Sequence, residues 1–272
     1  MKFVTYILDG GAQPRFGFKK DQYIIDVIRA AIWANENNGD PSFLEIPSTL
    51  KRALENWSSN LDRLQTLNNS LPDINIHSHS GGDKPIAILE EEVQLLSPVP
   101  NPPSFRDFYA FEQHVRAARK LRGLDMHPDW FKIAIFYFSN PAATFGHKEY
   151  IPYPKGTKEL DFELEFSVVI ANGGSDISHE DADQYIAGYM ICNDWSARDL
   201  QREEMAMSLG PAKGKDFASS FGPYMVTPDE LKDAWDNNGK LHLRMTCHVN
   251  DKLISDGNTN DLYHPFTKMI ER

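Results

Sequence analysis

Apolar and acidic side chains alternate from Leu160 to Ile170, which predicts a β-strand. Residues two apart in a strand share a face, so Glu163 and Glu165 should point the same way. The later part of the strand is almost wholly apolar and is expected to be buried on both faces. Two buried carboxylates repel each other, and a hard cation with oxygen ligands would offset that repulsion. The alternative is a sheet edge whose two glutamates lie on a wet face.

Short apolar runs and helical patterns fill the first third of the chain. The predicted elements are strands over residues 4–8 and 23–27 and helices over residues 28–36 and 50–67. Prolines between 98 and 103 stiffen a connector. We therefore predict an α+β region over residues 1–97 and a second region over residues 98–272. His77 and His79 lie in a polar segment, where an exposed loop is the preferred interpretation over a metal-binding pair.

The second region opens with Ser104, which is a suitable helix cap. A helix that starts there places Asp107 and His114 about two turns apart on one face. The alternatives are an aspartate that only complements the helix dipole and a surface histidine. A basic run follows, in which Arg122 is able to reach an anionic ligand.

Two further stretches are predicted as buried strands. Residues 130–138 carry Tyr137, and residues 187–192 deliver Asp194 at the strand end, where sites are commonly built. Asp194 is therefore a candidate site residue beside the two glutamates.

Basic side chains follow Asp194 along the chain. Arg198 and Gln201 are three residues apart and share a face in the first turn of a predicted helix. A loop punctuated by glycine then presents Lys215. Ion pairs with Asp199 and Asp216 are the alternative roles for Arg198 and Lys215.

The overall charge limits the classes of partner. The chain has 272 residues, of which 41% are hydrophobic, and a net charge of −11. This balance argues against nucleic acid and anionic membranes as partners, although a local basic site can still bind a small acid. Apolar runs fall short of a membrane span, and two cysteines favour a reducing, cytoplasmic compartment.

Four motifs occur in one order in the second region. They are Asp-Phe-Tyr-x-x-x-Gln-His at 107–114, Leu-Asp-Phe-Glu-Leu-Glu at 160–165, Asn-Asp-Trp-Ser-Ala-Arg-Asp-Leu-Gln at 193–201 and Leu-Gly-Pro-x-x-Gly-Lys-x-Phe at 209–217. Each alone is weak, but together they resemble the fumarylacetoacetate hydrolase family, and the first is characteristic of its fumarylacetoacetase-like branch. Family members usually continue beyond the end of this chain, so the second region is expected to be incomplete at its C-terminal end.

The resemblance implies a fold and a set of roles. The implied fold is α+β and β-rich, a mixed β-sandwich roll with the smaller α+β region in front. The implied ligands of a Mg²⁺ or Ca²⁺ ion, with Mn²⁺ as a further candidate, are Asp107, Glu163, Glu165 and Asp194. The implied catalytic groups are His114 as the base that activates water, with Lys215 and Arg198 stabilising charge. The implied substrate contacts are Tyr109, Arg122, Tyr137 and Gln201, with Ser219 near the ion.

The chemistry of these residue types agrees with the implied activity, hydrolysis of a carbon–carbon bond in a diketo acid of the fumarylacetoacetate or acylpyruvate type. A diketo acid chelates a hard cation, and a neutral imidazole takes a proton from water. One alternative is a decarboxylase, hydratase or isomerase of 2-oxo acids on the same site, and another is a protein that binds a small acid without catalysis. The family further implies a cytoplasmic homodimer in aromatic amino acid catabolism.

Overall fold

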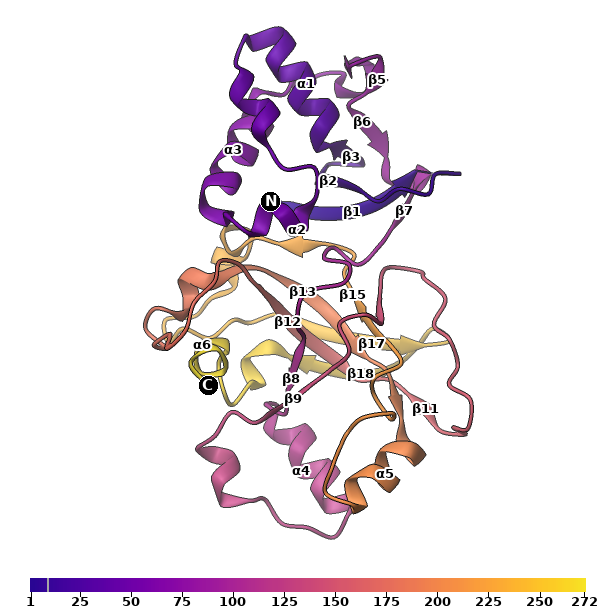
Figure 1. Cartoon of the computed structure of the whole chain (residues 1–272). Helices are drawn as coiled ribbons and strands as arrows, with labels where there is room; N and C mark the ends of the chain where they lie inside the picture. The colour runs from indigo at the N-terminus through magenta and orange to yellow at the C-terminus, as the bar shows by residue number, and fades with distance from the viewer. Residues whose placement is uncertain (9) are drawn as a thin grey trace.

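A large mixed sheet runs through the part of the chain that the structure describes, which is residues 1–8 and 10–272 of a computed structural model (Figure 1). Its strands follow the order β10-β15-β13-β16-β1-β2-β3-β6, with β12 also paired to β13 and β7 to β1. Their bounds are β1 Lys2–Leu8, β2 Arg15–Lys20, β3 Tyr23–Asp26, β6 Ala87–Leu89, β7 Val93–Leu95, β10 Thr144–Phe145, β12 Leu164–Ile170, β13 Ile186–Asp194, β15 Ser219–Phe221 and β16 Met225–Val226. Together with the helices, this sheet confirms the predicted α+β, β-rich fold class.

Three helices cover the N-terminal strands. They are α1 Val27–Asn38, α2 Leu50–Leu54 and α3 Trp57–Ser70. The side chain of Asp26 accepts a hydrogen bond from the Arg29 amide at the start of α1, and Gly39 ends the helix in the left-handed region at φ 68°. His77 and His79 pack against the rings of Tyr23 and Trp33. Each of the two histidines thus has an aromatic packing partner.

The sheet does not stop at the predicted border near residue 97. Strand β1 pairs with β16 through Lys2 and Val226, and the buried core around Phe3 continues to Met225 on β16. The two predicted regions thus share one sheet and one core. Their division near residue 97 stays a prediction.

Small two-stranded sheets and three more helices complete the second region. The strand pairs of the second region are β8 Arg106–Phe108 with β9 Phe136–Phe138, β11 Leu160–Asp161 with β14 Ser196–Ala197, and β17 Arg244–Val249 with β18 Lys252–Asn258. A further pair, β4 Ser80–Gly81 with β5 Lys84–Pro85, belongs to the N-terminal region. The helices are α4 Glu112–Leu121, α5 Arg198–Ala206 and α6 Phe266–Glu271. Helices α4 and α5 lie at the end of the molecule opposite α1 and α3 (Figure 1).

Two predicted elements around residue 104 and residue 130 are wrong. The helix predicted from Ser104 starts only at Glu112, and Asp107 lies on strand β8 instead. A cross-strand aromatic pair explains the strand: Phe108 and Phe136 lie opposite each other in the β8–β9 pair, with tilted rings whose centroids are 4.9 Å apart. The buried strand predicted over 130–138 begins as a 3₁₀ turn at Pro128, which the side chain of His127 caps, and only Phe136–Phe138 is a strand.

The burial predicted for the apolar end of β12 is also wrong. Its residues are half-buried, and Ile170 is exposed, because a cavity of about 850 Å³ runs along the strand. Aromatic side chains of Phe108, Phe136 and Phe266 line the same cavity. Every helix in the described ranges is too short or too polar to span a bilayer.

Candidate active site

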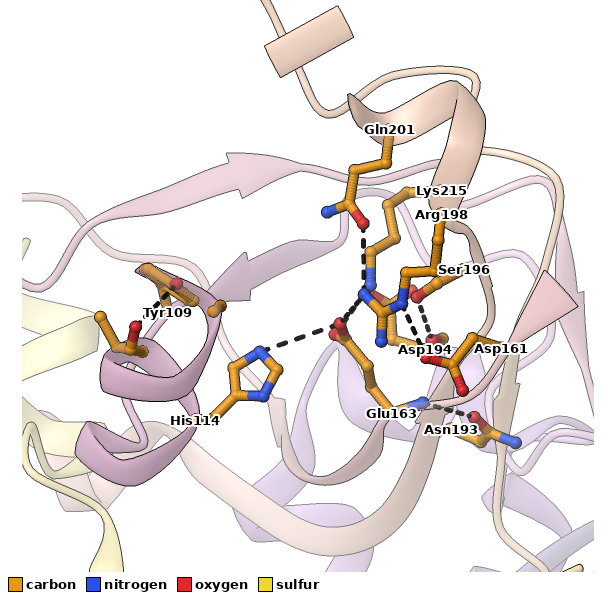
Figure 2. A network of polar contacts seen from close by, with 12 residues as sticks. Tyr109, His114, Asp161, Glu163, Asn193, Asp194, Ser196, Arg198, Gln201 and Lys215 are labelled. Atoms are coloured by element: carbon orange, nitrogen blue, oxygen red, sulfur yellow. Dashed lines mark hydrogen bonds and ion pairs between the residues drawn. The ribbon is translucent and has the colours of Figure 1, made fainter. Parts of the chain in front are cut away.

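Glu163 is the centre of a network of charged side chains (Figure 2). One carboxylate oxygen accepts a hydrogen bond from Arg198 Nη1 at 2.6 Å, and the other accepts from Lys215 Nζ at 2.7 Å. The ring of His114 lies on the same carboxylate, with Nε2 3.8 Å from Oε1. The Glu163 side chain is only 12% exposed, so the alternative of a wet sheet face is wrong. Although burial acts to raise the pKa of Glu163, its polar neighbours, with the charge of Lys215 as the largest effect and that of Arg198 beside it, hold it below its usual value.

Asp194 lies fully buried at the end of β13, as the strand pattern predicted. Its Oδ2 accepts hydrogen bonds from Lys215 Nζ at 2.5 Å and from the Tyr137 hydroxyl at 2.8 Å, and the Ser219 hydroxyl lies 3.5 Å from Oδ1. Burial and the charge of Glu163 raise the pKa of Asp194 despite the opposing effect of Lys215. Asp194 and Glu163 thus share one ammonium group.

Lys215 is 3% exposed and joins the two carboxylates. Burial alone would lower its pKa, but Glu163 and Asp194 raise the pKa above its ordinary value, so the ammonium stays charged. The alternative of an ion pair with Asp216 is wrong for Lys215, since Lys213 takes that partner at 3.2 Å.

Asp107 and Glu165 add two more carboxyl groups beside Glu163 and Asp194. Asp107 stands opposite Tyr137 in the β8–β9 pair. Glu165 lies on β12 and Glu163 just before it, because the strand predicted over 160–170 is interrupted at Phe162 and Glu163. Burial, followed by the charges of Glu163 and Asp194, raises the pKa of Glu165 to about 8. Burial and the charges of Asp194 and Glu165 raise the pKa of Asp107 well above its ordinary value. Both side chains line the cavity beside β12.

Four carboxyl groups within range of each other's charge are a donor set that suits a hard divalent cation. Such an ion would remove the repulsion that raises the pKa values of Asp107 and Glu165. The residues present therefore fit the implied metal, with Asp107, Glu163, Glu165 and Asp194 as the side chains that would hold it. Among residues 1–8 and 10–272, the group of metal-ligand type whose ligand atoms all lie within 4.8 Å of one another is a different one at the surface, His179, Glu180 and Glu271.

We predict that Glu165→Gln stabilises the metal-free protein at alkaline pH. A carboxyl with a folded pKa of about 8 and an ordinary value of 4.5 makes the folded state lose stability as the pH rises from about 4.5 through about 8. Glutamine has no such titration, so the Tm of the variant should exceed that of the wild type at pH 8.5 but match it near pH 5. Calorimetry with a chelator present measures both. An equal Tm difference at the two pH values would contradict the prediction.

Arg198 is held by two acids and an amide. Its Nε donates to Asp161 at 2.7 Å, and its Nη1 donates to Glu163 and, at 3.2 Å, to the Gln201 side chain (Figure 2). The alternative partner Asp199 instead accepts from the Thr157 hydroxyl and the Lys158 amide. Sequence reasoning missed Asp161, although its position two residues before Glu163 on an alternating strand is a signal for a shared face.

His114 approaches the network from α4, and Tyr109 approaches it from the segment between β8 and α4. Their rings meet edge to face with centroids 5.8 Å apart, and the Tyr109 hydroxyl lies 3.5 Å from the Val115 carbonyl oxygen. Burial lowers the pKa of His114 more than Glu163 raises it, which favours the neutral imidazole. Arg122 lies at the exposed end of α4, where its Nε donates to the Ala118 carbonyl at 3.2 Å and its charge acts on Tyr109. Its role as a substrate contact stays a prediction.

A family model described as the fumarylacetoacetate hydrolase C-terminal region matches residues 104–272. The chain belongs to the fumarylacetoacetate hydrolase family. The chain is 31% identical over 214 residues to a fumarylacetoacetase of Arabidopsis thaliana, a match that covers 71% of this chain and 47% of that enzyme. It therefore spans about half the length of this relative.

Two further matches cover almost all of the chain. A mitochondrial oxaloacetate tautomerase of Xenopus laevis is 27% identical over 271 residues, which covers 96% of this chain and 71% of that protein. The crystal structure of maleylpyruvate hydrolase from Sphingobium sp. SYK-6, in complex with manganese(II) and pyruvate, superposes with a TM-score of 0.63. It is 19% identical, and the match covers 100% of this chain and 81% of that one, so it confirms the fold. The relatives named here carry the names of enzymes.

Proposed function

We propose that this protein is a divalent-metal-dependent hydrolase that cleaves a carbon–carbon bond in an acylpyruvate-type diketo acid. The observation that carries the proposal is the meeting of His114, Lys215 and Arg198 on Glu163, beside three further acids. The manganese and pyruvate in the maleylpyruvate hydrolase complex support the same class of metal and product.

The bound ion, His114 and Lys215 have different roles in this reaction. A divalent ion, when bound, would polarise a substrate carbonyl as a Lewis acid. His114 takes a proton from water, whose oxygen then bonds to that carbonyl carbon. The carbon–carbon bond breaks, its electron pair leaves with the pyruvate part as an enolate, and the His114 proton returns to the enolate carbon. The positive charge of Lys215 stabilises the enolate. The Lys215 side chain is only 3% exposed, so water screens this charge little.

The second candidate is a tautomerase of oxaloacetate or a similar 2-oxo acid. It is favoured by the alignment with the Xenopus laevis tautomerase, which includes the N-terminal region of this chain. Tautomerisation moves a proton between carbon and oxygen and consumes no water. Both candidates use the same ion and the same stabilisation of an enolate, so His114 is the residue that separates them.

His114→Ala should lower kcat for acylpyruvate cleavage by about 10²–10⁴-fold, with KM changed only a few-fold, because the base is lost while the metal ligands remain. Pyruvate release, measured with lactate dehydrogenase and NADH, follows the reaction. His127→Ala is the matched control, since that histidine is 60% exposed and caps the 3₁₀ turn at Pro128 without an ion pair to the Glu163 network in the described part of the chain. Full activity in His114→Ala, or oxaloacetate tautomerisation without pyruvate release in the wild type, would favour the second candidate.

A further inference from the structure

Glu204 is an acid in an unfavourable place on its own helix. It lies in the last turn of α5, where the negative end of the helix dipole repels a carboxylate. Its two oxygens accept three backbone hydrogen bonds from the loop that follows, from the amides of Ala212 at 2.8 Å, Lys213 at 2.6 Å and Gly214 at 3.2 Å. Charge-assisted bonds of this kind are among the strong ones in proteins. They compensate for the unfavourable position and tie the loop to the helix.

The next residue of the loop is Lys215. From the other side, the Ala197 amide donates to the Gly214 carbonyl at 2.8 Å, so the backbone before Lys215 is held at both faces. A Cβ on Gly214 would lie 2.8 Å from Gln201 Cα, which shows how closely the loop approaches α5. The position of the buried ammonium between Glu163 and Asp194 thus depends on a loop that Glu204 binds.

We propose that Glu204 is a positioning residue, which acts through the 212–214 backbone to place Lys215 on the two carboxylates. The expected effect of Glu204 on catalysis rests on the proposed function. The expected effect of Glu204 on the position of Lys215 does not. Glu204 does not contact the reacting atoms, and its influence should vanish when the lysine is absent.

The first test is lysine labelling with acetic anhydride, read by mass spectrometry. Lys213 is the internal reference, because it lies on the same loop and is 80% exposed, against 3% for Lys215. Glu204→Ala should raise the labelling of Lys215 relative to Lys213 by about tenfold, and Glu204→Gln should give an intermediate value, since one accepting oxygen remains. Glu203→Ala, an exposed neighbour on α5, should change nothing. An unchanged ratio in Glu204→Ala would overturn the proposal.

The second test is a double-mutant cycle with Lys215→Ala, in which kcat for the diketo acid is measured. Glu204→Ala should lower kcat by about 10–100-fold in the wild type and by less than about twofold in the Lys215→Ala background. An equal loss in both backgrounds would mean that Glu204 only supports the helix, and would overturn the proposal. If the wild type turns over no diketo acid, the proposed function fails, whereas the labelling ratio still decides the role of Glu204.

Discussion

Glu163→Gln should lower kcat/KM for an acylpyruvate by roughly a thousandfold and weaken Mn²⁺ binding at least tenfold. The carboxylate of Glu163 has three positively charged or protonatable partners, Lys215, Arg198 and His114, and a neutral amide would satisfy none of their charges. The variant keeps the shape of the side chain, so the loss reports the charge. Isothermal titration of Mn²⁺ and a pyruvate-release assay measure the two effects.

Glu159→Gln is the matched control for this substitution. Glu159 lies four residues earlier, is half exposed and pairs with Arg202 at 2.7 and 2.8 Å outside the network. Exposed pairs contribute little, so the control should keep both metal binding and turnover. Wild-type Mn²⁺ affinity in Glu163→Gln would show that Glu163 is not a metal ligand, and unchanged turnover would remove it from the proposed mechanism.

Asp194→Asn should destabilise the protein by about 3 kcal/mol, measured by urea unfolding of the metal-free form. The substitution removes a charge that is fully buried and leaves the ammonium of Lys215 with Glu163 alone. Removing one partner of a buried ion pair is costly, because the remaining charge is poorly compensated. Burial of Asp194 itself works in the opposite direction, since it raises the pKa of this carboxyl.

The double variant Asp194→Asn with Lys215→Met separates the two contributions. It removes both buried charges and retains similar volumes, so most of the lost stability should return, while turnover should stay near zero. Glu163 keeps Arg198 as its partner in that variant. A double variant that is even less stable than Asp194→Asn would show that Lys215 stabilises the fold independently of Asp194.

Periodicity and strand ends predicted the centre of the site well. Alternation indicated that Glu163 and Glu165 share a face, although β12 begins only at Leu164 and Glu163 lies just before it. The apolar run before Asp194 predicted a buried strand that ends at this residue. Both signals depend on local geometry, in which side chains two apart share a face. The spacing of Arg198 and Gln201 likewise predicted their contact in the first turn of α5.

Pairings between distant segments were beyond such reasoning. Ser104 is a good local helix cap, yet the pairing of Phe108 with Phe136 makes a strand of that segment and places Asp107 on it. Asp107 and His114 therefore reach the site from a strand and a helix, not from one helix face. The contact of Glu204 with the 212–214 backbone left no trace in local periodicity, because its partners are amides, which every residue except proline carries.

The ladder between β1 and β16 has a consequence for how this protein can change over evolutionary time. The border between the N-terminal region and the acid cluster lies inside one sheet, where Tyr189 of β13 faces Val226 of β16, which in turn faces Lys2. Strand β13 ends in Asp194, so a single series of neighbouring strands joins the first residues of the chain to the deepest carboxylate. An exchange of the N-terminal region for an unrelated module would leave β16 with an open edge. The N-terminal region thus contributes strands to the same sheet that ends in Asp194.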